Sequence, residues 1–206
     1  MMHPATELRS AGVPIGLGVF ATDFIPRGTV VWVHDPLDRV FDEPGLAALP
    51  PILRAQVDRY GHRDGDGRRV LCWDHARFMN HACDPTTTSV GTLMEIARRD
   101  LHPGDELTCE YGLDYVSEAF DCRCRSPACR GTLVPADPTA QRRRWDRESQ
   151  EAFDHALTVD QPALAAAASV GPGAAIVAAI LARRPMRLPS WLDGTPGSAV
   201  GQPRRS

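Results

Sequence analysis

Three short stretches of the chain combine residue types that bind ligands or take part in catalysis. The first is Gly16-Leu17-Gly18, where the missing Cβ of glycine allows the backbone to approach a ligand closely. The second, residues 77–85, brings an amide, an imidazole and a thiol together in Asn80-His81-Ala82-Cys83. The third, residues 103–112, is a turn followed by a predicted strand that ends at Tyr111. Taken singly, each stretch is more often a turn, a loop cap or a core tyrosine than a site.

The six cysteines divide into a cluster and three scattered residues. The cluster is Cys122-x-Cys124-x4-Cys129, and in a reducing compartment such spacing indicates a metal before it indicates disulfides. Structural zinc takes four tetrahedral ligands, so the cluster supplies three of them. The alternative is a disulfide or a group of free thiols. Cys72 and Cys109 fall on predicted strands, where we expect them to be buried as small apolar residues.

Composition limits the class of protein. A length of 206 residues suits one domain with attachments, and the 18 Pro and 17 Gly argue for a loop-rich fold and against a helix bundle. Nothing in the net charge of −3 indicates a protein that coats nucleic acid, and all 23 residues counted as Lys or Arg are Arg. Because the N-terminal residues lack the apolar core of a signal peptide, we expect a cytoplasmic protein.

The local pattern predicts short strands with irregular connections. A helix is predicted over residues 46–60, with its start broken by Pro50-Pro51. The missing alternation of strand and helix favours several small sheets over a parallel α/β fold. The predicted strands are residues 30–33, 69–73, 89–98 and 107–111, and the predicted turns are residues 64–67 and 101–104.

The last third of the chain is predicted to be helical. Asp137-Pro138 is a typical helix start, and the helix has an apolar face that comprises Trp145, Ala152, Phe153, Ala156 and Leu157. An Ala-rich segment follows over residues 162–184, and Gly171-Pro172-Gly173 divides it into halves too short to span a membrane. We therefore expect two further soluble helices. Residues 189–206 are expected to be disordered.

In this order, the stretches resemble the SET-domain protein lysine methyltransferases. Residues 16–21 are similar to the first SET motif, residues 77–85 to its Asn-His-x-Cys-x-Pro motif, and residues 104–112 to its Glu-Leu-Thr-x-Asp-Tyr motif. Residues 122–131 resemble the post-SET zinc segment. The resemblance covers about residues 5–133.

The resemblance implies a mainly β fold, the SET-domain or β-clip fold. In it, small sheets surround a pseudoknot, and the Asn-His segment threads beneath the Tyr-bearing loop. The implied parts are a SET domain at 5–115, a post-SET zinc segment at 116–134, short C-terminal helices at 135–188 and a tail at 189–206.

The resemblance also implies a cofactor, a metal and a role for each motif. The cofactor is S-adenosyl-L-methionine, the catalytic residue is Tyr111, and Cys83 completes a structural Zn²⁺ site with Cys122, Cys124 and Cys129. Four thiolates and one Zn²⁺ leave an excess of negative charge, which Arg123, Arg125 and Arg130 are placed to offset. The implied cofactor-binding residues are Gly16, Leu17, Gly18, Tyr60, Arg77, Asn80, His81 and Tyr111.

The activity implied is transfer of a methyl group to a lysine ε-amine of a protein substrate, with no membrane partner. Thr86, Glu110 and residues 34–36 depart from the family pattern. The first alternative is therefore a catalytically inactive SET-like zinc-containing module that binds protein. The second, a zinc-stapled nucleic-acid binder, is disfavoured by the acidic balance and the missing basic stripe. The residues that choose the substrate fall in the least recognisable segment, residues 34–66.

Overall fold

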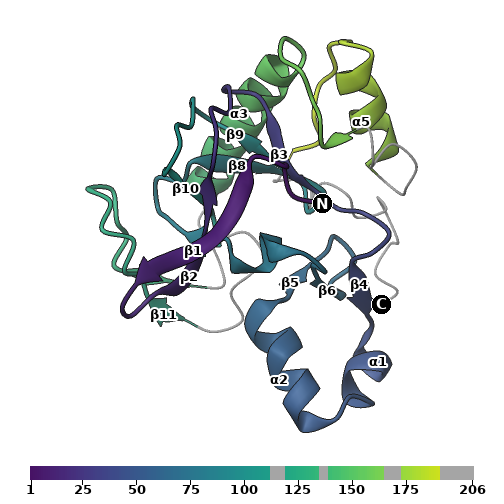
Figure 1. The fold of residues 1–206 in the computed structure, drawn as a ribbon. Helices are drawn as coiled ribbons and strands as arrows, with labels where there is room; N and C mark the ends of the chain where they lie inside the picture. The colour runs from purple at the N-terminus through teal and green to yellow at the C-terminus, as the bar shows by residue number, and fades with distance from the viewer. Residues whose placement is uncertain (112–118, 135–138, 165–172, 191–206) are drawn as a thin grey trace.

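The computed structural model describes residues 1–111, 119–134, 139–164 and 173–190, and these ranges form small β-sheets with helices at their edges (Figure 1). This architecture confirms the mainly β fold class. No helix in the described ranges is both long enough and apolar enough to span a bilayer.

The first sheet brings distant parts of the chain together. Its order is β1 (Thr6–Gly12), β2 (Gly16–Ala21), β10 (Glu106–Cys109) and β7 (Asn80–His81). β7 and β10 run parallel, with Asn80 opposite Thr108 and His81 opposite Cys109. The two best motifs therefore lie side by side, as predicted. The predicted threading beneath the Tyr-bearing loop concerns residues 112–118, which lie outside the described residues.

The second sheet lies at the centre of the core. Its order is β3 (Val30–Val33), β9 (Met94–Ala97) and β8 (Thr87–Val90), and every residue in these strands is buried. The single strand predicted over residues 89–98 is wrong, because β8 and β9 form an antiparallel hairpin. The chain turns at Gly91, which has a φ of 59°, a left-handed conformation that glycine adopts without strain.

The third sheet and two helices form a separate lobe at the bottom of Figure 1. The sheet has the order β4 (Arg39–Phe41), β6 (Arg69–Leu71) and β5 (His62–Arg63). In place of the one helix predicted over 46–60 there are two, α1 (Glu43–Ala47) and α2 (Pro51–Tyr60), because Pro50 caps the second and Pro51 begins it. The predicted turn at 64–67 is confirmed, with the Gly67 N–H donating to the Asp64 carbonyl at 3.0 Å.

Three smaller elements complete the chain before the C-terminal helices. A 3₁₀ helix, η1 (His75–Phe78), leads directly into the Asn-His segment. Further along, β11 (Phe120–Asp121) and β12 (Thr132–Leu133) pair antiparallel and enclose the cysteine cluster between them.

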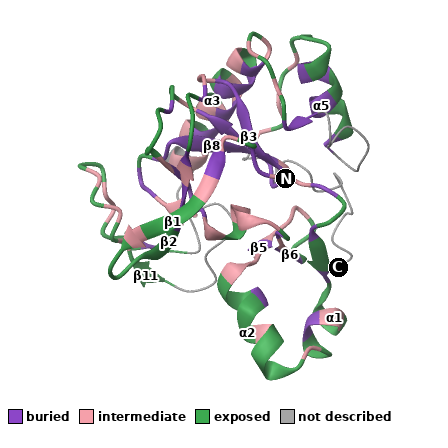
Figure 2. Ribbon diagram, viewed as in Figure 1, coloured by how far each residue is buried: buried purple, intermediate pink, exposed green. Residues whose placement is uncertain are grey.

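The C-terminal helices cover the second sheet. α3 (Thr139–Ala156) packs on β8 and β9, and the predicted apolar face of this helix is confirmed (Figure 2). α5 (Ala174–Leu181) joins the same core cluster and is the second half of the Ala-rich segment. Three predicted features lie outside the described residues: the helix start at 137–138, the first half of the Ala-rich segment over 165–172, and the tail from 191 onward. The buried residues of the α3 face are Trp145, Ala152, Phe153 and Ala156, with Leu157 partly buried against the cluster.

Candidate active site and metal centre

Tyr111 lies two residues after the end of β10 and is fixed against the Asn-His segment. Its hydroxyl donates to the carbonyl of Met79 at 2.5 Å, and its backbone N–H donates to Nδ1 of His81 at 3.1 Å. Burial raises the pKa of Tyr111, with smaller effects from Cys109 and Glu106. The hydroxyl therefore stays protonated at neutral pH, with its proton directed at the Met79 carbonyl.

His81 is held as a neutral imidazole that links Tyr111 to the cysteine cluster. Its pKa is lowered to about 4, mainly by burial and to a smaller extent by the Arg130 charge. Because a backbone N–H only donates, Nδ1 of His81 accepts from Tyr111 and the proton resides on Nε2, which lies 3.3 Å from Sγ of Cys83. The carboxylate of Glu110 lies 3.6 Å from Nδ1, but the contact is not an ion pair while the ring is neutral.

Asn80 joins the glycine motif to β10. Its Nδ2 donates to the Leu17 carbonyl at 2.9 Å and to Oε1 of Glu106 at 2.7 Å. A Cβ added to Gly18 would lie 2.5 Å from that Glu106 oxygen and 2.9 Å from Asn80 Nδ2. A side chain at position 18 would therefore displace the ends of the Glu106 and Asn80 side chains. Gly16, with a φ of 97°, is required by the turn between β1 and β2.

Two cavities meet at Tyr111. We call the first the groove; it has a volume of about 310 Å³ and is lined by Pro14, Ile15, Asn80, His81, Tyr111 and residues 120–124. We call the second the inner cavity; it has a volume of about 100 Å³ and is lined among others by Tyr60, Arg77, Met79 and Tyr111. Of the predicted cofactor residues, Asn80 and His81 line the groove, Tyr60 and Arg77 line the inner cavity, and Tyr111 lines both, whereas Gly16, Leu17 and Gly18 line neither.

The walls of both spaces are aromatic near Tyr111. In the groove, the Tyr111 ring lies 5.4 Å from that of His81 and 6.4 Å from that of Phe120. On the inner side, Tyr60 contacts Phe78 edge to face at 5.1 Å, and the Arg77 guanidinium lies 5.3 Å from the centre of the Phe78 ring. This contact of Arg77 lies within η1, and its role in supporting the Asn-His segment stays a prediction.

The four cysteines predicted to bind zinc are brought together. The sulfur atoms of Cys83, Cys122, Cys124 and Cys129 all lie within 4.8 Å of one another, and all four are free thiols. The Cys83 and Cys122 sulfurs are 3.7 Å apart, close to the edge of about 3.8 Å of a tetrahedron with Zn–S bonds of about 2.3 Å, and much longer than a disulfide bond. Cys72 and Cys109 are buried elsewhere, as predicted.

Backbone N–H groups point at sulfur atoms of this cluster, as they do at metal-bound thiolates. The N–H of Cys83 points to Sγ of Cys124 at 3.4 Å, and that of Arg130 to Sγ of Cys83 at 3.3 Å. Burial and the neighbouring thiols raise the pKa of Cys122, so the cluster needs a cation before all four sulfurs ionise. The donor set, spacing and N–H groups fit a structural Zn²⁺.

Of the three arginines expected to offset the charge of the metal site, Arg130 makes clear contacts. Its guanidinium donates to Oε1 of Glu110 at 2.6 Å, and Arg144 from α3 lies 3.6 Å from the other Glu110 oxygen. Among the described residues, no ion pair includes Arg123 or Arg125. Glu110, one of the departures from the family pattern, therefore joins the zinc segment and α3 to the end of β10.

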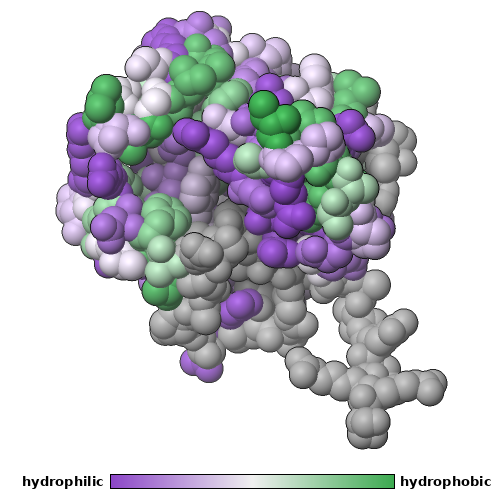
Figure 3. Space-filling view, turned by 90° about the horizontal axis from the view of Figure 1, so that it is seen from below, coloured by the Kyte–Doolittle hydropathy of each residue, from purple (hydrophilic) through white to green (hydrophobic). Residues whose placement is uncertain are grey.

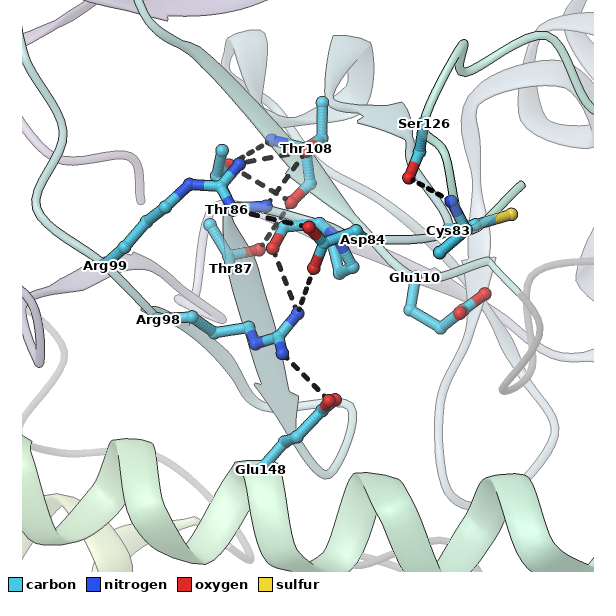
Figure 4. Close-up of polar contacts among 12 residues, drawn as sticks. Cys83, Asp84, Thr86, Thr87, Arg98, Arg99, Thr108, Glu110, Ser126 and Glu148 are labelled. Atoms are coloured by element: carbon cyan, nitrogen blue, oxygen red, sulfur yellow. Dashed lines mark hydrogen bonds and ion pairs between the residues drawn. The ribbon is translucent and has the colours of Figure 1, made fainter. Parts of the chain in front are cut away.

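Thr86, another departure, also has defined partners (Figure 4). Its hydroxyl accepts from the Thr108 N–H at 2.7 Å and its own N–H donates to Thr108 Oγ1 at 3.0 Å. Nearby, Arg98 bridges the Pro85 carbonyl at 3.1 Å and Glu148 of α3 at 2.8 Å. These contacts hold the loop after Cys83 between β10 and α3.

Residues 16–112 match the protein family described as the SET domain. This part of the chain is a SET domain. The match confirms the resemblance over these residues, and the wider span of 5–133 and the division at 115 and 134 stay predictions.

The relatives of this SET domain are much longer proteins. Histone-lysine N-methyltransferase set1 of Dictyostelium discoideum is 38% identical over 65 residues, which are 28% of this chain and 4% of the relative. Histone-lysine N-methyltransferase ash1 of Drosophila melanogaster is 33% identical over 85 residues, 35% of this chain and 4% of the relative. The chain thus spans only a small part of these relatives. The methyltransferase domain of human SETMAR aligns with a TM-score of 0.44 and 17% identity, covering 65% of this chain and 58% of that one.

The SET domain contains polar residues at the inner cavity that the sequence motifs did not reveal. Glu95, His62 and Trp32 all line it, from β9, β5 and β3. Burial lowers the pKa of His62 to about 4, so that this histidine is neutral. None of the three belongs to a recognisable motif; the one available signal was the charged Glu95 within an otherwise apolar strand.

Proposed function

We propose that the chain is an S-adenosylmethionine-dependent protein lysine N-methyltransferase. The observation that carries the proposal is the position of Tyr111, which lines both the groove and the inner cavity. Transfer between two substrates requires two binding sites that meet where the bond forms, with the reacting atoms aligned. A SET domain that places its tyrosine at such a junction supports this reaction.

The cofactor is assigned to the groove. Its volume of about 310 Å³ lies at the lower end of small-molecule sites, and its aromatic walls at His81 and Phe120 suit a purine ring. Asn80 lines the groove and donates to the Leu17 carbonyl, which links the glycine motif to this wall. S-adenosylmethionine supplies a methyl group on a positively charged sulfur. The chain's contribution is to hold that methyl beside Tyr111.

The lysine side chain is assigned to the inner cavity. Its amine attacks only when neutral, and transfer from water into a buried cavity favours the neutral form. The lone pairs of the Tyr111 hydroxyl accept an N–H of the amine and so orient it toward the groove. Tyr111 does not serve as the base, because burial raises its pKa further above the ordinary value of about 10.

The metal has a structural role in this proposal. Cys83, Cys122, Cys124 and Cys129 would hold one Zn²⁺, which fixes the segment around Phe120 against the Asn-His segment. Since Cys83 lies three residues after Asn80, loss of the metal would loosen one wall of the groove.

The substrate is proposed to be a protein that presents a lysine, and histones are the first candidates because the relatives' names specify histone lysine. The face of the molecule seen from below mixes hydrophobic and hydrophilic residues (Figure 3). On the lower lobe, α2 exposes Ile52 and Leu53, which a protein substrate would contact. The expected cytoplasmic location stays a prediction.

Labelled methyl transfer tests the proposal. The protein is incubated with S-adenosylmethionine that carries a tritiated or heavy methyl group, together with core histones or a cell lysate, and labelled lysines are located by mass spectrometry. Because the chain contains no Lys, every labelled lysine belongs to an acceptor. Labelled lysines that disappear with Tyr111→Phe support the proposal. Cofactor binding by calorimetry without any transfer would instead favour the inactive binding module.

A further inference from the structure

A buried carboxyl group lies at the inner cavity without a charged partner. The Glu95 side chain comes from β9 and is 3% exposed. Its two oxygens accept from the hydroxyls of Thr87, at 2.5 Å, and Ser89, both on the neighbouring strand β8. No ion pair among the described residues includes Glu95. Burying an unpaired carboxylate is costly, so its retention in a cavity points to a cation that arrives with a ligand.

The cavity is built for a slender polar occupant. Its volume of about 100 Å³ has room for several heavy atoms, since a single water needs about 10–15 Å³. The indole N–H of Trp32, which is 4% exposed, has no hydrogen-bond partner in the described part of the chain. Trp32 lies opposite Glu95 in the β3–β9 ladder. A wall with an unpartnered donor and an unpaired carboxyl is unsuited to a wholly apolar group.

We propose that Glu95 binds the ε-amino group of the substrate lysine and accepts its proton before methyl transfer. The inference rests on the proposed function. In this step an N–H bond of the ammonium breaks, its electron pair stays on nitrogen as the attacking lone pair, and an O–H bond forms on Glu95. The amine is then neutral and the carboxyl group uncharged, so neither is left as an unpaired charge in the cavity.

The protonation behaviour of Glu95 suits this role. Its pKa is raised to about 7, mainly by burial; the Ser89 and Thr87 hydroxyls oppose this rise and the Glu110 charge contributes to it. The group therefore exchanges a proton near neutral pH. A lysine ammonium beside it favours the carboxylate, and burial of that ammonium lowers the lysine pKa toward that of its acceptor.

The other titratable groups around the cavity do not compete for this proton. Burial raises the pKa of Cys72, Cys109 and Tyr111, so these groups stay protonated near pH 7, whereas His62 is already neutral. Behind β10, the Glu110 charge is met by Arg130. From α3, Ser149 donates to the Ser89 carbonyl at 2.7 Å. The remaining charged groups that line the cavity are Asp58, Arg59 and Arg77.

Carboxyl NMR tests amine binding without any turnover. Glutamate labelled with ¹³C at the carboxyl carbon reports the titration of Glu95 in the wild-type protein, with n-butylammonium as a probe for the lysine side chain. We expect a midpoint near pH 7 that moves at least half a pH unit lower when the probe is added. A Glu95 midpoint that does not respond to the probe overturns the proposal.

Kinetics of Glu95→Gln test the proton transfer, with the acceptor found by methyl labelling. In the wild type, log kcat/KM is expected to change with pH around a midpoint near pH 7. In Glu95→Gln we expect kcat/KM at pH 7 to fall at least tenfold and this pH-dependent change to disappear. The matched control, Glu151→Gln, removes an exposed carboxylate of α3 that pairs with Arg27, and should keep the wild-type profile. A wild-type profile in Glu95→Gln refutes this inference alone, whereas absence of transfer by the wild type refutes the proposed function.

Discussion

Replacing Glu110 with Gln is expected to lower the free energy of unfolding by about 3 kcal/mol. The Glu110 carboxylate is 3% exposed and faces two guanidinium groups, Arg130 at 2.6 Å and Arg144 at 3.6 Å. Removing one partner of a buried ion pair costs about 3–5 kcal/mol, because the remaining charge loses its counterion without regaining water. The Arg130 and Arg144 side chains are 19% and 33% exposed, which places the expected cost at the lower end.

The assay is equilibrium unfolding in urea with zinc present, on the wild type, Glu110→Gln and Glu151→Gln. The last variant makes the same change in an exposed ion pair, 62% exposed at Glu151, and should cost less than about 1 kcal/mol. High salt should abolish the smaller effect and retain most of the larger one, because buried pairs are screened less. Equal costs in the two variants would refute the idea that Glu110 holds the zinc segment and α3 together.

Four further changes test the site. Cys83→Ser is expected to lose the one bound zinc, whereas Cys72→Ala keeps it; metal content by mass spectrometry decides, and full zinc in the first variant contradicts the ligand set. Tyr111→Phe should slow transfer at least tenfold, about 1.4 kcal/mol, with cofactor affinity changed only a few-fold by calorimetry; normal turnover would exclude the hydroxyl from the mechanism. Asn80→Ala should weaken cofactor binding by about 1–3 kcal/mol, and equal affinity would place the cofactor elsewhere. Since burial lowers the pKa of His62 from 6.5 to about 4, the unfolded chain takes up a proton that the folded chain refuses as pH falls between these values. The free energy of unfolding should therefore fall by up to about 3 kcal/mol between these two pH values. When it is measured by urea unfolding and plotted against pH, its slope in this range should be smaller by one proton in His62→Asn than in the wild type. An unchanged slope would mean that His62 is not buried as a neutral imidazole.

The sequence by itself determined the SET domain, the motif residues of the candidate active site and the four cysteines of the candidate metal site. Gly16-Leu17-Gly18, Asn80-His81 and Tyr111 are ordinary when taken singly, and their order along the chain is what resembles the SET motifs. The spacing of Cys122, Cys124 and Cys129 predicted three zinc ligands and the resemblance supplied Cys83 as the fourth, and the sulfur atoms do converge. The apolar face of α3 followed from helical periodicity alone, since that face had to be buried.

Only the tertiary structure decided what these residues contact. The parallel pairing of β7 with β10 places Tyr111 against Met79 and separates the groove from the inner cavity, and no local pattern encodes such a pairing. The hairpin at Gly91 was predicted as one strand because both of its strands are fully buried. Without the alternation of apolar and polar residues that marks a half-buried strand, the sequence does not show where one strand ends and the next begins.

The partners of Glu110 and Glu95 likewise depend on the fold. Arg130 and Arg144 reach Glu110 from the zinc segment and from α3, far along the chain. Glu95 becomes a cavity residue because β8, β9 and β3 pair in one register and leave its carboxyl beside the space that Tyr111 lines. Residue types and spacing specify which groups are available, but burial and charge pairing arise from contacts between segments distant in sequence.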